Sequence, residues 1–124
     1  MNVNEINMAA LAYLGDAVYE LEIRKYLLNK KISKSNDLQK SAINYVSAKA
    51  QAEILENLQD KNIFNEAELL LIKKARNYKT ASKPRYVDIK TYKKATALEA
   101  LFGALYISNN FSRIKILMKE ILGD

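Results

Sequence analysis

The chain has 124 residues, with 20 Lys and Arg against 14 Asp and Glu, and it contains no His and no Cys. This length fits one compact domain, and the net charge of +6 makes polyanions such as RNA or DNA the natural partners. The absence of His and Cys excludes the usual zinc sites and the Ser-His and Cys-His nucleophiles, so catalysis would depend on carboxylates with a hard cation such as Mg²⁺, or on Lys, Tyr and hydroxyl groups.

The location expected for this chain is the cytoplasm. The absence of Cys agrees with a reducing compartment, and the first residues lack the charged-then-apolar pattern of a secretory leader. The most apolar stretch, near Leu98–Ile107, is too short to cross a hydrocarbon core of about 30 Å. We therefore expect a soluble protein.

The composition predicts an all-α fold. One Pro and three Gly favour helices joined by short turns, and no alternating apolar run indicates a strand. The first predicted helix runs from about Asn4 to about Leu28. Its apolar residues, spaced three or four apart, are Leu11, Leu14, Val18 and Leu21.

Capping residues and apolar spacing place the other predicted helices. Asn36 or Asp37 is the expected cap of the second helix, Ser47 that of the third, and Asn65 with Glu68 the capping pair of the fourth. The stretch 78–90 has no helical periodicity and is predicted to be a loop. The predicted helices after the first cover about 37–45, 48–60, 66–77, 91–107 and 111–122. We expect one domain over residues 1–124 with about six or seven helices.

Two glycines stand inside predicted helices, where Gly costs about 1 kcal/mol relative to Ala. Gly15 directly precedes Asp16, and Gly103 lies one turn after Glu99. A helix tolerates such a cost where another backbone passes closely. Our hypothesis is that the first and fifth helices cross at these glycines and bring the two acids together, with a cation between them to offset their repulsion. Spacing alone favours a simpler interpretation, in which the glycines only relieve packing and both acids face water.

Two segments carry a resemblance to a known family. The segment LAYLGDAV, from Leu11 to Val18, resembles the signature helix of the ribonuclease III family, which centres on a Leu-Gly-Asp step. The segment from Lys94 to Tyr106 resembles that family's second acidic helix, and the two occur in the family's order. The resemblance implies a ribonuclease III-type helical domain in which Asp16 and Glu99 are the catalytic, metal-binding carboxylates.

Further segments resemble Mini-ribonuclease III, the branch of the family that consists of the catalytic domain alone. These segments are Asn36-Asp37-Leu38, the run from Val46 to Leu55, and Arg76-Asn77. The match covers nearly the whole chain and leaves no residues for the double-stranded-RNA-binding domain that usually follows. It implies an endoribonuclease that cuts the paired stem of the 23S ribosomal RNA precursor and leaves a 5′-phosphate and a 3′-hydroxyl.

The same resemblance implies partners besides the RNA. Cutting both strands of a duplex requires two active sites related by a two-fold axis, and one short domain supplies only one. We therefore expect a homodimer, formed through an apolar face of the first or fifth helix. A ribosomal protein is the helper that the resemblance suggests.

Two acids of the wider family's pattern are absent. Ala12 stands four residues before Asp16, and Thr96 stands three residues before Glu99, a loss that Mini-ribonuclease III shares. Asp16 and Glu99 are therefore the expected ligands for Mg²⁺, for which Mn²⁺ would substitute. Glu20, one turn after Asp16, is a further candidate through a water-mediated contact, and the alternative is a solvated acid near Arg24. With fewer carboxylates, the cation relies more on waters and RNA phosphates.

Basic residues gather between Lys73 and Lys94, opposed there by Asp88 alone. Such a segment can follow a phosphate backbone, and double-stranded RNA is recognised mainly by shape, phosphates and 2′-hydroxyls. The alternative is that this charge run is only solvated surface. The candidates for RNA contact are Arg76, Lys79, Lys83, Arg85 and, outside this segment, Lys49.

Two other functions fit the composition. A non-catalytic double-stranded-RNA-binding module would result if the absence of acids at Ala12 and Thr96 abolished metal binding. A basic helical DNA-binding regulator has this size and charge, although no short turn followed by a convincing recognition helix supports it. Incubation of duplex RNA with and without Mg²⁺ separates these functions from the nuclease.

Overall fold

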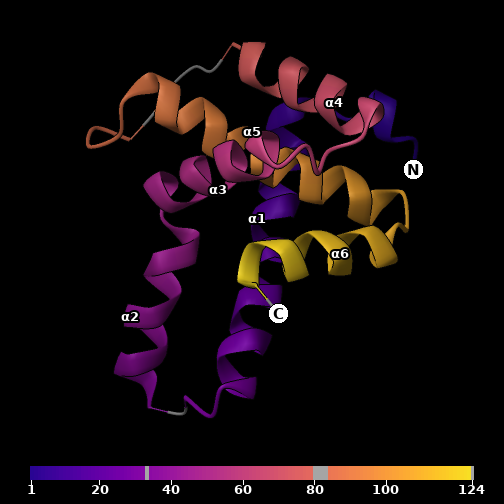
Figure 1. Ribbon diagram of the computed structural model, residues 1–124. Helices are drawn as coiled ribbons and strands as arrows, with labels where there is room; N and C mark the ends of the chain where they lie inside the picture. Colours follow the sequence, from indigo (N-terminus) through magenta and orange to yellow (C-terminus); the bar gives the residue numbers. More distant parts are fainter. Residues whose placement is uncertain (33, 80–83, 124) are drawn as a thin grey trace.

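The computed structural model describes residues 1–32, 34–79 and 84–123, and all regular structure in these ranges is helical (Figure 1). The predicted all-α fold is confirmed. None of the helices found there is long and apolar enough to cross a membrane. The elements are the 3₁₀ turn η1 (Val3–Glu5) and the helices α1 (Met8–Asn29), α2 (Ser35–Val46), α3 (Ala48–Asp60), α4 (Glu66–Asn77), α5 (Ile89–Ile107) and α6 (Phe111–Leu122).

Helix α5 is the centre of the fold, because α1, α3, α4 and α6 all contact it. Leu98, Leu101, Phe102 and Leu105 of α5 are all buried. Alanines on the other sides of α5 are buried as well, so neighbouring helices cover it almost all round. Tyr19 of α1 packs edge-on against Phe102, with 5.4 Å between the ring centroids.

Helix α1 changes its packing partner along its length. Its first half crosses α5, whereas its second half and α2 form a hairpin that projects from the other helices (Figure 1). Because the packing partner changes, the buried residues in the second half of α1 are Tyr19, Ile23 and Leu27. The predicted apolar row is therefore wrong at Leu21, whose side chain is 58% exposed.

Three of the expected helix boundaries are confirmed. The side chain of Ser47 caps α3 by accepting a hydrogen bond from the Ala50 N–H at 3.2 Å. Asn65 and Glu68 form a reciprocal capping box at the start of α4, since each side chain accepts the other's backbone N–H. Helix α6 has the predicted limits.

Other boundaries differ from the prediction. Helix α1 begins at Met8 because Asn7 caps it, and the residues before it form η1. Neither Asn36 nor Asp37 caps α2, since both lie inside its first turn. Helix α5 begins two residues earlier than predicted, because the side chain of Asp88 accepts the Thr91 N–H at 2.9 Å.

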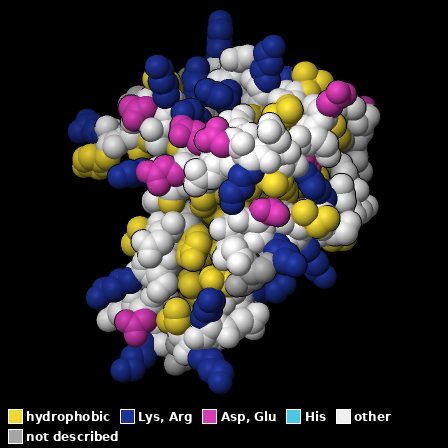
Figure 2. Space-filling model, in the orientation of Figure 1, with side chains coloured by type: hydrophobic (Ala, Val, Ile, Leu, Met, Phe, Trp, Pro, Cys, Tyr) yellow, Lys and Arg dark blue, Asp and Glu magenta, His cyan; other side chains and the backbone are white. Residues whose placement is uncertain are grey.

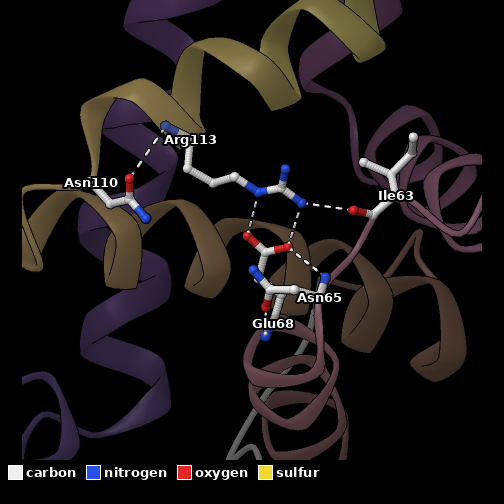
Figure 3. Close-up of polar contacts among 5 residues, drawn as sticks. All are labelled: Ile63, Asn65, Glu68, Asn110 and Arg113. Atoms are coloured by element: carbon white, nitrogen blue, oxygen red, sulfur yellow. Dashed lines mark hydrogen bonds and ion pairs between the residues drawn. The ribbon is translucent and has the colours of Figure 1, made fainter.

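A partly buried ion pair, in which the carboxylate is the buried partner, joins α6 to the start of α4 (Figure 3). The Arg113 guanidinium donates from Nε and Nη2 to the two carboxylate oxygens of Glu68, at 2.8 Å each. Its Nη2 also donates to the Ile63 carbonyl at 2.7 Å, so the α3–α4 connection is held by the same group. The Glu68 carboxylate raises the pKa of Arg113 above its ordinary value, which keeps the pair charged.

Candidate active site at a helix crossing

Helices α1 and α5 cross with their backbones in contact at the two predicted glycines. A Cβ atom at Gly15 would lie 1.6 Å from the backbone carbonyl oxygen of Glu99. A Cβ atom at Gly103 would lie 2.0 Å from the backbone oxygen of Leu11. Neither distance is compatible with any side chain, so glycine is required at both positions. The predicted tight crossing is confirmed.

The crossing brings the carboxyl groups of Asp16 and Glu99 within hydrogen-bonding contact. Asp16 is exposed, whereas Glu99 is half-buried. Burial, contact with Asp16 and the charge of Asp16 together raise the pKa of Glu99 from 4.5 to about 8. Two acids held in this way need either a shared proton or a cation between them.

The two acids open onto a cleft of about 260 Å³ between α1, α4 and α5. Ala12 and Thr96, the positions where the family's pattern has further acids, both line this cleft. The missing carboxylates would therefore have pointed into the site, and neutral side chains replace them. The remaining lining residues are Ala9, Tyr13, Ala75, Tyr78, Tyr92 and Lys93.

Glu20 lies near the pair without joining it. Its charge contributes to the raised pKa of Glu99, but its carboxylate is ion-paired with Arg24 at 2.8 Å. Across residues 1–32, 34–79 and 84–123, no three Asp, Glu, His or Cys side chains surround one point. The donor set nevertheless fits Mg²⁺, which binds through one or two carboxylates and completes its coordination with waters and substrate phosphates.

Two further polar side chains stand behind Glu99. The hydroxyl group of Tyr19 donates to the Tyr45 carbonyl at 2.8 Å, and burial raises the pKa of this phenol above its usual range. Gln51 on α3 is buried, and its side chain lowers the pKa of Glu99, against the effect of burial. Sequence reasoning overlooked Gln51 because a single amide inside an apolar helix face carries no motif.

Of the predicted RNA-binding residues, Lys49, Lys79 and Arg85 are exposed and Arg76 is partly buried. Lys83 lies outside the described residues. Figure 2 shows Lys and Arg side chains along the upper edge of the molecule, over the end of α4 and the start of α5, and again at the end of the α1–α2 hairpin.

A second cleft, of about 410 Å³, adjoins the site on its basic side. Lys73, Arg76, Lys90 and Lys93 line it together with Gln59, Leu69, Ile72 and Asn77. Lys93 lines both this basic cleft and the cleft of the two acids. Sequence reasoning counted Lys93 in the basic segment but did not single it out, although helical spacing from Lys93 to Thr96 and Glu99 places all three near one face.

Large apolar side chains remain exposed where α1, α5 and α6 meet. Leu21, Tyr106 and Phe111 are each about half exposed, and with Leu14 they line a cleft of about 340 Å³. Tyr13, three residues before Asp16, is 85% exposed. This surface is more apolar than a solvated helix face needs to be.

Comparison with known proteins gives consistent matches. The model of the ribonuclease III domain family matches residues 9–110. The Mini-ribonuclease 3 of Staphylococcus aureus is 37% identical over 121 residues, which is 98% of this chain and 90% of that protein. The Mini-ribonuclease 3 of Brevibacillus brevis is 43% identical over 117 residues, covering 94% of this chain and 86% of that protein. A crystal structure of a Fusobacterium nucleatum protein superposes with a TM-score of 0.85 at 34% identity, over 97% of this chain and 96% of that one.

Proposed function

The chain belongs to the ribonuclease III family, as an endoribonuclease of the Mini-ribonuclease 3 branch, and on that premise we propose that it is a Mg²⁺-dependent enzyme that cleaves the double-stranded stem of the 23S ribosomal RNA precursor. The observation that carries this proposal is the contact between the Asp16 and Glu99 carboxyl groups at a cleft with a basic neighbour.

Asp16 and Glu99 would hold the cation, and Mn²⁺ would substitute for Mg²⁺. When bound, the ion would orient a water, lower its pKa and offset the charge that develops on the attacked phosphate. Asp16, which is exposed, would face the incoming RNA, whereas the helix crossing fixes the backbone of Glu99. Hydrolysis would leave a 5′-phosphate and a 3′-hydroxyl. Glu20, ion-paired with Arg24, would contribute only through a water.

The basic cleft would hold the duplex beside the two acids. Lys93 lies where a phosphate could contact both clefts, and Arg76 lines the basic one. Lys79, Arg85 and Lys49 would extend the contact along the backbone, and Lys83 stays a candidate from sequence alone. These groups contact phosphates and 2′-hydroxyls rather than base edges, which suits recognition of a duplex by its shape.

A homodimer would supply the second active site. The exposed apolar surface around Leu21, Tyr106 and Phe111 is the candidate interface, because a two-fold contact pairs such a surface with its own copy. A ribosomal protein bound to the precursor would be a helper, and the cytoplasm is the expected compartment.

The test is cleavage of an end-labelled RNA duplex and of the matching DNA duplex, with Mg²⁺ or with a chelator. We expect the protein to cleave the RNA duplex only when Mg²⁺ is present. The Asp16→Asn variant should bind the duplex without cutting it. Asp60→Asn, which neutralises an exposed acid at the end of α3, is the matched control and should cut at the wild-type rate. Binding without cleavage by the wild type would favour the non-catalytic module, for which the neutral residues Ala12 and Thr96 argue. Preference for DNA would favour the DNA-binding regulator.

A further inference from the structure

Gln51 is a polar side chain buried at the back of the site. It lies in the first turns of α3, a helix that packs against α5, and it is 2% exposed. Among the residues that the structure describes, its Nε2 has no hydrogen-bond partner of normal geometry. A buried amide without a partner costs about 1–3 kcal/mol, so a fold retains one where it has a use.

The Gln51 side chain interacts with the carboxyl group of Glu99. Gln51 favours the charged form of Glu99, whereas burial, Asp16 and Glu20 all favour the neutral form. Tyr19 is close enough to interact with Glu99, but its hydroxyl already donates to the Tyr45 carbonyl. Gln51 therefore offers the N–H donor that a charged Glu99 would need.

We propose that Gln51 is a positioning residue for the metal site, whose side-chain amide donates to the Glu99 carboxylate when a divalent cation binds between Glu99 and Asp16. This inference rests on the proposed metal-dependent function. In the metal-free protein the Gln51 amide lies near enough to the Glu99 carboxyl to lower its pKa, but without a hydrogen bond of normal geometry. With the cation held between Glu99 and Asp16, the Glu99 carboxylate would accept the Gln51 N–H, and this bond would fix the rotamer of the Glu99 side chain.

A neutral donor suits this position better than a charged one. A Lys or Arg beside Glu99 would neutralise the carboxylate permanently and repel the cation from it. An amide orients the ligand and leaves its negative charge available to the metal. Partners of this kind, behind a metal ligand, affect metal affinity by about 10–100-fold when they are removed.

The first experiment compares Gln51→Met with Gln39→Met, an exposed glutamine on α2. Methionine has a similar length but no donor. We expect Gln51→Met to weaken Mn²⁺ binding about tenfold or more in calorimetry without RNA. Its melting temperature without metal should equal or exceed that of the wild type, because an unpartnered amide has been removed from the interior. Unchanged Mn²⁺ affinity would overturn the proposal, and so would a lower melting temperature with the affinity intact.

The second experiment needs no variant, so it remains valid if Gln51→Met does not fold. Side-chain amide NMR signals of the ¹⁵N-labelled protein are followed while Mg²⁺ is added. The Gln51 Nε2–H signal should move downfield as the hydrogen bond to Glu99 forms, and the Gln39 signal should stay in place. A Gln51 signal that does not move while Mg²⁺ binds would overturn the proposal.

The two proposals fail in different ways. If the wild-type protein neither binds divalent ions nor cleaves duplex RNA, the proposed function is wrong and Gln51 has no metal ligand to position. If the wild-type protein binds Mg²⁺ and cleaves while Gln51→Met matches it in metal affinity, only the role of Gln51 is wrong.

Discussion

Gly15 of α1 faces the backbone carbonyl of Glu99 on α5 so closely that a Cβ atom at position 15 would lie 1.6 Å from that oxygen. The contact is between two main chains, so no rotation of a side chain can make room. It also places Asp16, the next residue, beside the Glu99 carboxyl. The glycine thus determines both the packing of the two helices and the spacing of the two acids.

Gly15→Ala should therefore destabilise the protein by about 3 kcal/mol or more, since the helices must separate to admit the methyl group. Urea unfolding followed by circular dichroism measures this change. Gly123→Ala is the control, because its Cβ would meet nothing within 4 Å and only its left-handed backbone, with φ of 76°, is strained. That change should cost about 1 kcal/mol. Equal stability of the two variants would mean that the crossing is not as tight as described.

Metal binding should release a proton at neutral pH. The pKa of Glu99 is raised to about 8, mainly by burial and then by Asp16, so this carboxyl is protonated at pH 7 and must lose its proton to a cation. Calorimetry in buffers of different ionisation enthalpy should show about one proton released per Mg²⁺ at pH 7 and almost none above pH 9. Glu99→Gln should abolish the release. Absence of proton release in the wild type at pH 7 would contradict the raised pKa.

The same pKa predicts how stability without metal depends on pH. Between 4.5, the ordinary pKa of a glutamate, and about 8, the folded state binds a proton that the unfolded state has lost. The contribution of Glu99 to the free energy of unfolding is therefore complete below pH 4.5 and disappears as the pH rises to about 8. Urea titrations at several pH values, for the wild type and for Glu99→Gln, isolate this contribution. The difference between the two proteins should change in this window and be constant above it.

Removal of single charges from the basic cleft should change the salt dependence of RNA binding. Arg76→Met and Lys93→Met should each weaken duplex binding and lower the slope of log affinity against log salt by about 1, because each variant would lose one of the proposed phosphate contacts. Lys93→Met should also slow cleavage, since Lys93 lines the cleft of the two acids. Lys119→Met, an exposed cation near the end of α6, is the control and should keep the wild-type slope. Identical slopes for the wild type and the three variants would show that the basic cleft is not part of the RNA interface.

The Arg113–Glu68 pair should matter more for stability than any exposed ion pair of this chain. Arg113→Met leaves a carboxylate that is 4% exposed without its partner, which costs about 3–5 kcal/mol. Lys25→Met breaks the ion pair with Glu22 along one side of α1, in which the lysine is 60% exposed, and should cost less than about 1 kcal/mol. Thermal unfolding of both variants measures the difference. Similar melting temperatures for the two variants would show that water solvates the Glu68 carboxylate well enough to replace Arg113.

Local signals make part of the fold predictable. Ser47 and Asn65 cap helices through contacts within four residues, so the sequence around them is sufficient. The prediction fails at Leu21 because burial along α1 depends on which helix lies against each part of it, and that is a property of the tertiary fold. The early start of α5 is predictable in principle, since Asp88 stands three residues before Thr91 and caps its N–H.

The candidate site also has features that local sequence patterns predict and features that depend on tertiary packing. The pairing of Gly15 with Asp16, and of Gly103 with Glu99, is a local pattern that suggests a close helix crossing. Spacing alone favours the simpler interpretation, with both acids in water, and the resemblance to the ribonuclease III family is what favours the crossing. Gln51 comes from a third helix and reaches Glu99 only through packing, so no spacing along the chain connects them. Lys93 is one of many basic residues in its segment, and only the position of the two clefts distinguishes it.

Ala12 and Thr96 have a consequence for the order in which the complex assembles. A cleft with four carboxylates would repel an approaching phosphate until cations had filled it. Here the lining presents two acids, and the raised pKa of Glu99 keeps that carboxyl protonated at neutral pH, while Lys93 adds a positive charge to the same lining. Electrostatic repulsion between this cleft and a polyanion is therefore weak. On the proposed function, RNA and the cation would therefore bind in either order.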